Sequence, residues 1–306
     1  MKFPNRSQLL RLFFKASLIL SVIGAIGLLS LYLYLTPKLP PTEALQDVRM
    51  QVPLRVYSKE GQLIAEFGEQ KRIPLRYEQF PKDLIHAFLS AEDDRFFEHP
   101  GVDYQGILRA ALNLVLTGER GQGGSTITMQ VARNFFLSRE RTYSRKINEI
   151  LLSLKIEDEL SKEEILELYL NKIYLGRRAY GAAAAAQVYY GKGLDELTLS
   201  QLAMIAGLPK APSTYNPIVN PDRAQLRRNY VLRRMHELEY ISDEQYEEAV
   251  AAPVTATDDN VITDMRAPYV AEMVRAEMYD RYGADAYSYG YKVYTTIDGR
   301  LQQAAN

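Results

Sequence analysis

One glutamate, Glu92, ends a stretch in which apolar residues recur at helical spacing. At about 100° per residue, Glu92 falls on the same side of a helix over residues 84–92 as Leu84 and Phe88. Asp93 falls on the opposite side. Burial and the negative end of the helix dipole both disfavour the charge of such a carboxylate, so the pKa of Glu92 should be raised. A carboxylate of this kind suits general acid or base catalysis. The alternative is an ordinary helix-end glutamate whose register is shifted by one residue.

A second stretch, residues 121–134, reads GQGGSTITMQVARN. Its glycines allow a backbone to approach a ligand closely, and Ser125 and Thr126 add hydroxyl groups. A helix that begins here would direct free N–H groups at an anion. The stretch is not a nucleotide-binding P-loop, because the Lys-Ser/Thr ending is missing. The alternative is a glycine-rich turn with a serine cap.

Basic residues cluster in and after this stretch, at Arg133, Arg139, Arg141, Arg145 and Lys146. Arg145 and Glu149 lie four residues apart, opposite the apolar side of a helix over residues 147–154. One interpretation is a solvated helix surface with an ion pair worth a few tenths of a kcal/mol. The other is a phosphate-binding cluster, because guanidinium groups match phosphate oxygens. Composition does not decide between the two.

The overall composition narrows the classes of function. The 306 residues carry 37 Lys and Arg against 38 Asp and Glu, with 47% apolar residues, which is typical of a globular protein of about two domains. A nearly neutral chain argues against a nucleic-acid-binding protein. The chain has no cysteine and three histidines. Disulfides, thiolate zinc sites and cysteine nucleophiles are excluded, and a histidine-rich metal site is disfavoured.

Residues 16–35 contain no charged side chain. As a helix they would extend about 30 Å, the thickness of the hydrocarbon core of a bilayer. Four basic residues precede them, at Lys2, Arg6, Arg11 and Lys15. We therefore predict a transmembrane signal-anchor with residues 1–15 in the cytoplasm. The alternatives are a cleaved signal peptide and a buried core helix.

The elements that must position these residues are mostly helical. Residues 56–59 and 62–67 are strand-like and flank a turn at Glu60–Gly61, which indicates a β-hairpin. From about residue 81 to residue 250 the signals are helical, and residues 291–296 again alternate as a strand does. Helix starts are predicted at Asp83, Ser161, Ser200 and Ser242.

Five motifs follow one another between about residues 54 and 234. They are EDxxFxxHxG from Glu92, GGSTIT followed by Gln130, RKxxE from Arg145, ILELYLN from Ile165 and GLPKAPSxYNP from Gly207. In this order they resemble the family 51 glycosyltransferase domain of class A penicillin-binding proteins. One departure is Met129, where that family usually has a glutamine. We expect the methionine to fill the same space, with the loss of a hydrogen bond and not of activity.

The resemblance implies a mainly α, lysozyme-like glycosyltransferase domain with a small N-terminal β-hairpin, preceded by a single transmembrane helix. The domain organisation would be a cytoplasmic tail (1–15), the membrane helix (16–35), a linker (36–53), the glycosyltransferase domain (54–250), and a linker with the start of a missing transpeptidase domain (251–306). The Ser-x-x-Lys and Lys-Thr-Gly motifs of a transpeptidase do not occur in the 306 residues. No transpeptidase activity is therefore expected of this chain.

The resemblance also implies a reaction, the polymerisation of lipid II into β-1,4-linked glycan with inversion at C1 and release of undecaprenyl pyrophosphate. Glu92 would be the base that deprotonates the acceptor hydroxyl, and Glu149 would assist at the pyrophosphate. His99 is expected to hold its loop. The candidates that neutralise the leaving group are Arg133, Arg141, Arg145, Lys146 and Lys210. The candidates that position the sugars and loops are Ser125, Thr126, Gln130 and Asn171.

The expected partners are lipid II, the growing lipid-linked glycan, the bilayer and other cell-wall synthesis proteins, but not nucleic acid. No metal ligand and no obligatory cofactor are expected, and a divalent cation at the pyrophosphate is left open. The chain would lie in the inner (cytoplasmic) membrane with its catalytic domain in the periplasm. The apolar residues 102–116 would form either an interfacial helix or a core helix.

Two other functions remain open at this stage. A lysozyme-like enzyme that cleaves glycan would use Glu92 as its acid. Such an enzyme has no pyrophosphate to bind, so the basic cluster argues against it. A non-catalytic membrane-anchored scaffold for cell-wall assembly would have no need of both Glu92 and Glu149.

Overall fold

The computed structural model describes residues 6–45, 50–117, 124–137, 142–258 and 263–306. These residues are mainly helical, as predicted. The α-helices are α1 (Arg6–Leu35), α2 (Lys82–Glu92), α3 (Tyr104–Thr117), α4 (Ile127–Phe136), α5 (Tyr143–Glu159), α6 (Lys162–Lys172), α7 (Ala182–Tyr190), α8 (Leu199–Gly207), α9 (Pro221–Glu237), α10 (Asp243–Ala251), α11 (Pro268–Tyr282) and α12 (Gly299–Ala305). The strands are β1 (Leu54–Tyr57), β2 (Leu63–Phe67), β3 (Lys71–Arg72), β4 (Ala179–Tyr180) and β5 (Lys292–Tyr294).

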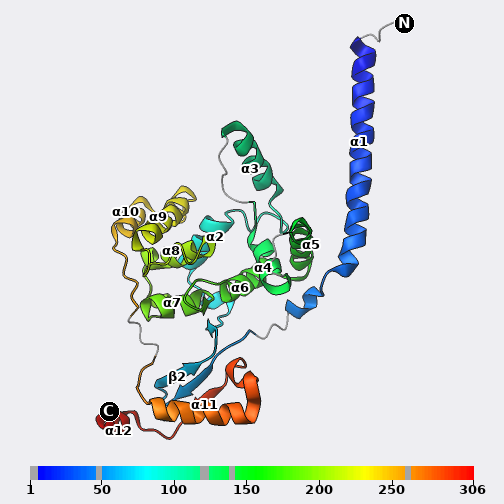
Figure 1. Ribbon diagram of the computed structural model, residues 1–306. Helices are drawn as coiled ribbons and strands as arrows, with labels where there is room; N and C mark the ends of the chain where they lie inside the picture. Colours follow the sequence, from blue (N-terminus) through cyan, green and yellow to red (C-terminus); the bar gives the residue numbers. More distant parts are fainter. Residues whose placement is uncertain (1–5, 46–49, 118–123, 138–141, 259–262) are drawn as a thin grey trace.

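Two groups of helices form the main core. Helix α8 packs against α2 and α9, and α10 packs on α9, whereas α4 packs against α5 and α6. Helix α7 contacts both α6 and α8 and so joins the groups (Figure 1). Helix α8 has the sequence LSQLAMIAG and is buried over most of its length, which explains its central place in the first group. The two groups also meet at the end of α2, where Gln130 of α4 donates a hydrogen bond to Glu92.

The helix boundaries follow the predicted capping signals closely but not everywhere. Ser161 and Ser242 cap α6 and α10 through capping boxes, as predicted. Ser200 was expected to open a helix, but the cap is Thr198, whose hydroxyl accepts from the N–H of Gln201. Asp83 was expected to cap α2, but it lies in the first turn after Pro81. Both differences shift a boundary by two residues and leave the helices in place.

The predicted hairpin is confirmed, and it belongs to a larger sheet. Strands β1 and β2 pair antiparallel, and β1 also pairs in parallel with β5, in the order β2-β1-β5. Helix α11 covers this sheet (Figure 1) and packs its apolar side chains, such as Ala271 and Val274, against Val56 and Ile64. The sequence assigns the hairpin to the glycosyltransferase domain and residues 251–306 to a separate segment. In the structure, β1 of the hairpin and β5 of residues 251–306 are hydrogen-bonded neighbours.

Two helices present apolar side chains to solvent. The described side chains of α1 are mostly exposed, and Leu18, Ile23 and Leu33 are each more than half exposed. Helix α3 projects from the core at the end opposite the sheet (Figure 1), and its Leu108 is also exposed. Considering the described residues alone, none of the helices is long and apolar enough to cross a membrane. The transmembrane span over residues 16–35 stays a prediction.

Candidate active site

Glu92 lies at the junction of the two helix groups, at the last position of α2. Its Oε2 accepts a hydrogen bond of 3.0 Å from Nε2 of Gln130 on α4. Its Oε1 lies 3.5 Å from Nη2 of Arg227 on α9, and its side chain is 14% exposed. Burial raises the pKa of Glu92, and Gln130 and the neighbouring cations, Arg227 first, offset part of that effect. The predicted orientation of Glu92 toward the core and the predicted direction of its pKa shift are both confirmed.

Asp93 is buried, although the helical register placed it on the exposed side. The register fails because Asp93 is the C-cap of α2, with φ −162°, so the chain has already left the helix. Its carboxylate contacts Nε2 of His99 at 2.9 Å and accepts from the backbone N–H of Ile127 at 2.9 Å. The first motif is thereby attached to the first turn of α4, and His99 holds its loop as expected.

Thr126 and Gly101 fix the N-terminal end of α4. Thr126 is the N-cap, and its Oγ1 accepts from the N–H of Met129 and donates to the carbonyl of Gly101 at 2.6 Å. Gly101 has φ +87°, and a Cβ there would lie 2.7 Å from the carbonyl oxygen of Ser153. Only glycine fits this close approach. Thr126 therefore positions the helix that carries Gln130.

Glu149 is buried on α5, with 2% of its side chain exposed. It forms ion pairs with Arg145 and with Nζ of Lys146, the latter at 3.0 Å. The same ammonium donates to Oγ of Ser125 at 3.0 Å. A solvated surface ion pair is thus excluded for Glu149. The second and third motifs are connected through Ser125 and Lys146, as Glu92 and Gln130 connect the first and second.

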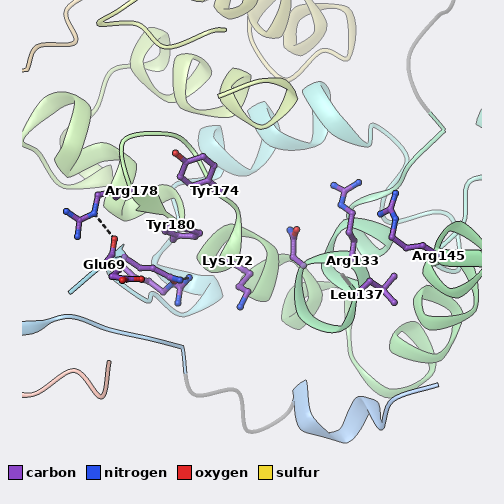
Figure 2. A pocket seen from close by; sticks show the side chains of 11 residues that line it. Glu69, Arg133, Leu137, Arg145, Lys172, Tyr174, Arg178 and Tyr180 are labelled. Carbon is purple, nitrogen blue, oxygen red and sulfur yellow. Dashed lines mark hydrogen bonds between the residues drawn. The ribbon is translucent and has the colours of Figure 1, made fainter. Parts of the chain in front are cut away.

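A cleft of about 930 Å³ opens beside this network. Figure 2 shows Arg133 and Arg145 at one end, Arg178 and Tyr180 at the other, and Lys172 between them. The remaining lining residues are Glu69, Gln70, Arg72, Asn134, Leu137 and Tyr174. In the part of the chain that the structure describes, Arg145 is the only cation of this cleft that forms an ion pair with a carboxylate. The cleft therefore suits an anionic ligand.

Neutral groups hold three of the other four cations of the cleft. Nε of Arg178 donates to the carbonyl of Glu69 at 2.7 Å. Arg72 donates from Nη1 to the carbonyl of Gln51 at 3.1 Å. The Lys172 ammonium lies 4.6 Å from the centre of the Phe135 ring. These contacts orient the positive charges without neutralising them.

A second, smaller cavity of about 440 Å³ is lined by residues that include Arg227, the partner of Glu92. Its lining includes Lys210 and Arg227, whose charges both act on Glu92, together with Arg223. Tyr215, Tyr230 and the exposed Leu226 supply its apolar surface. Arg227 is fixed by a hydrogen bond of 3.2 Å from its Nε to the carbonyl of Gly207 and by the Tyr230 ring 4.6 Å away. Glu92 is thus electrostatically coupled to cations of both cavities, since the charge of Arg133 also acts on it.

Two predicted site residues lie elsewhere or cannot be placed. Oδ1 of Asn171 accepts a hydrogen bond from the backbone N–H of Leu75 at 2.9 Å, and its Nδ2 donates to the carbonyl of Leu75 at 2.7 Å. Asn171 therefore attaches the segment around Leu75 to α6. Arg141 lies outside the described residues, as does Arg139 of the basic cluster. Met129 is buried, which agrees with the expectation that it fills space.

Sequence reasoning missed several members of the site. Arg227 occupies a position of α9 between the buried Ala224 and Val231, so an arginine on an apolar side of a helix was the available signal. Lys172 and Arg178 carried no such signal. The pairing of β3 with β4 brings Arg178 to the cleft, and Lys172 reaches it from the end of α6. Among the described residues, no group of three or more His, Asp or Glu could hold a metal ion.

More than half of the chain matches a known protein family. Residues 60–236 match the family described as transglycosylase. This range includes all five motifs, and it contains Glu92, Gln130, Glu149 and Arg227. The chain belongs to the transglycosylase family.

Its curated relatives are considerably longer proteins. The chain is 58% identical over 275 residues to penicillin-binding protein 1A of Pseudomonas aeruginosa, which covers 90% of this chain and 34% of that protein. It is 53% identical over 297 residues to penicillin-binding protein 1A of Escherichia coli, covering 96% and 35%. A solved structure of penicillin-binding protein 1A from Haemophilus influenzae is 39% identical, with a TM-score of 0.47, and covers 84% of this chain and 29% of that one. The chain spans about a third of the length of these relatives.

The raised pKa of Glu92 has a consequence for stability. The folded chain binds the Glu92 proton more tightly than the unfolded chain, so stability from the protonated form is lost as the pH rises through the raised pKa. Glu92→Gln, which mimics that form, should melt at the same temperature as the parent at neutral pH or up to about 4 °C higher. The difference should shrink as the pH falls toward the ordinary range of glutamate. Thermal unfolding at several pH values measures this, and a much lower melting temperature at neutral pH would contradict it.

Proposed function

We propose that the chain is a peptidoglycan glycosyltransferase that polymerises lipid II into β-1,4-linked glycan. The observation that carries this proposal is a buried carboxylate, Glu92, coupled to cations of two cavities. Arg133 lines the large cleft, and Arg227 and Lys210 line the small cavity. A polymerase of this kind needs room for two pyrophosphate-bearing substrates, a donor and an acceptor, with a base between their reacting atoms. Family membership and the relatives named penicillin-binding protein 1A support the same assignment.

In the proposed reaction, the 4-hydroxyl oxygen of the acceptor sugar attacks C1 of the donor. Glu92 takes the hydroxyl proton as the C1–oxygen bond to the undecaprenyl pyrophosphate breaks, and the configuration at C1 inverts. Arg133 and Arg145 in the cleft would neutralise the charge that develops on the pyrophosphate. Glu149 would act indirectly, because its ion pairs hold Arg145 and Lys146 in place.

The cleft also favours this reaction over glycan cleavage. Hydrolysis of a glycosidic bond leaves a sugar hydroxyl and no pyrophosphate, so it provides no ligand for five basic side chains along one cleft. A raised carboxylate pKa is common to both reactions and does not distinguish them.

The lipid tails of both proposed substrates require the site to lie at a membrane surface. We propose that residues 16–35 anchor the chain in the inner membrane and that the catalytic domain lies on the periplasmic side. The uncharged run and the basic residues before it support this, as do the exposed apolar side chains of α1. The exposed Ile107 and Leu108 of α3 would contact the interface beside the cleft. Other cell-wall synthesis proteins are proposed partners.

The central test is turnover of labelled lipid II by the purified chain in detergent. The parent chain should form long glycan, and Glu92→Gln should reduce turnover by at least about 100-fold, because a general base contributes that much or more. Glu98→Gln is the matched control, since Glu98 lies six residues further along the chain with 68% of its side chain exposed. Parent-like turnover by Glu92→Gln would refute the base assignment.

The pyrophosphate role of the cleft is tested by binding. Arg133→Ala should weaken the affinity for a pyrophosphate-bearing substrate analogue about tenfold, because it removes a charged hydrogen-bond donor. Arg233→Ala is the control, since that side chain is 56% exposed and pairs with Glu237 on the surface of α9. Equal affinities for the two variants, measured by calorimetry, would mean that the cleft does not bind the pyrophosphate.

The anchor is tested by deletion of residues 1–35. The full chain should sediment with membranes, whereas the shortened chain should remain in the supernatant after a high-salt wash, because the apolar run is gone. Both samples need the same melting temperature for the comparison to hold. If the full chain also stays in the supernatant, residues 16–35 are not an anchor.

A further inference from the structure

Tyr169 is a fully buried tyrosine on α6 that the proposed reaction does not yet use. Its ring meets the Phe88 ring edge-on, with the ring centres 5.9 Å apart and the planes at 86°. Phe88 precedes Glu92 by one turn on α2, so the two side chains lie on the same side of that helix. Tyr169 therefore packs against the side of α2 that presents Glu92.

The hydroxyl of Tyr169 has no hydrogen-bond partner among the described residues. A buried hydroxyl without a partner is unfavourable, and the great majority of such groups in folded proteins are paired. Tyr189 shows the usual arrangement, because it is equally buried and its hydroxyl donates to the carbonyl of Leu175 at 2.8 Å. An unpaired donor on a ring that packs against the helix of the candidate base calls for an explanation in terms of function.

The charges that act on this hydroxyl are those of the active site. Burial first, and then the negative charge of Glu92, raise the pKa of Tyr169 well above its ordinary value. Asp93, the C-cap of α2, raises it further, whereas Arg133 on α4 and Arg227 on α9 lower it. Tyr169 therefore keeps its proton at all pH values of interest and can serve only as a donor toward a carboxylate.

We infer that Tyr169 is a positioning residue for Glu92, whose hydroxyl donates a hydrogen bond to the Glu92 carboxylate in the substrate-bound enzyme. This inference rests on the proposed function, in which Glu92 is the base. In the free enzyme Gln130 holds Oε2 and Arg227 faces Oε1. When an acceptor hydroxyl approaches one oxygen, the carboxylate must turn, and the phenol provides a fixed donor for its new orientation. Tyr169 itself neither touches substrate nor transfers a proton.

The donor also tunes the base. A hydrogen bond to the charged form of a carboxylate favours that form and lowers its pKa. Tyr169 would then join Gln130, Arg133, Arg227 and Lys210, the other polar and charged groups around Glu92, in opposing the effect of burial. Loss of the phenol should raise the pKa of Glu92 in the enzyme–substrate complex. The acidic limb of the rate profile should move toward higher pH.

The experiment compares Tyr169→Phe with Tyr189→Phe in the full chain, using labelled lipid II, with kcat and KM measured across a range of pH. Tyr169→Phe should lower kcat about tenfold, the effect of one hydrogen bond to a charged group, with KM unchanged and the acidic limb of kcat moved upward. Its melting temperature should not fall, because no bond is lost in the free enzyme. Tyr189→Phe should melt at a lower temperature, with the limb unmoved.

A second variant works in the opposite direction. Incorporation of a fluorinated tyrosine at position 169 keeps the shape of the ring and makes the phenol a stronger donor. The acidic limb should then move to lower pH. This arm also keeps the test informative if Tyr169→Phe does not fold.

The outcomes separate this inference from the proposed function. If Glu92→Gln abolishes turnover but the Tyr169 variants leave kcat and the acidic limb unchanged, the positioning role is wrong and the base assignment stands. If Tyr169→Phe loses stability without a change of the limb, the residue is purely structural and the inference is overturned. If Glu92→Gln keeps full turnover, the proposed function itself fails.

Discussion

The structure depends on keeping one carboxylate, Glu92, in a largely dry junction between two groups of helices. Neither group provides its surroundings alone, since Gln130 comes from α4 and Arg227 from α9. Burial makes the charge of Glu92 unfavourable, and the surrounding donors and cations restore only part of that loss. The carboxylate is therefore a stronger base than an exposed glutamate, and the geometry of the junction decides whether it can act as one.

Helix α4 makes this junction possible. A backbone N–H of its first turn donates to Asp93 of the first motif, and its cap Thr126 donates to the loop of that motif. Ser125, just before the cap, accepts a hydrogen bond from Lys146 of the third motif. Motifs far apart in the chain are thus fixed to one short helix. Their order in the sequence reflects a single hydrogen-bonded assembly and not separate binding sites.

Much of this arrangement could be predicted from local patterns, and the failures have physical causes. Helical periodicity correctly turned Glu92 toward the core, but it misplaced Asp93, because periodicity ends where the helix ends. Capping boxes located α6 and α10. The far end of the cleft, with Arg178 and Tyr180, could not be predicted, because it depends on the long-range pairing of β3 with β4. Local sequence patterns predict the helices and strands. Which of them lie side by side depends on tertiary contacts that local patterns do not show.

The central strand β1 has a consequence for the order of folding. Its one neighbour, β2, follows within a few residues, but the other, β5, comes from the far end of the chain, and Thr295 bonds to Tyr57 across 238 positions. During synthesis β1 and β2 can form only an isolated hairpin, which is marginally stable on its own. The entire helical core has emerged before β5 arrives, so the core must fold with its N-terminal hairpin unfinished. Completion of the sheet is then a late, slow step that closes a very long loop.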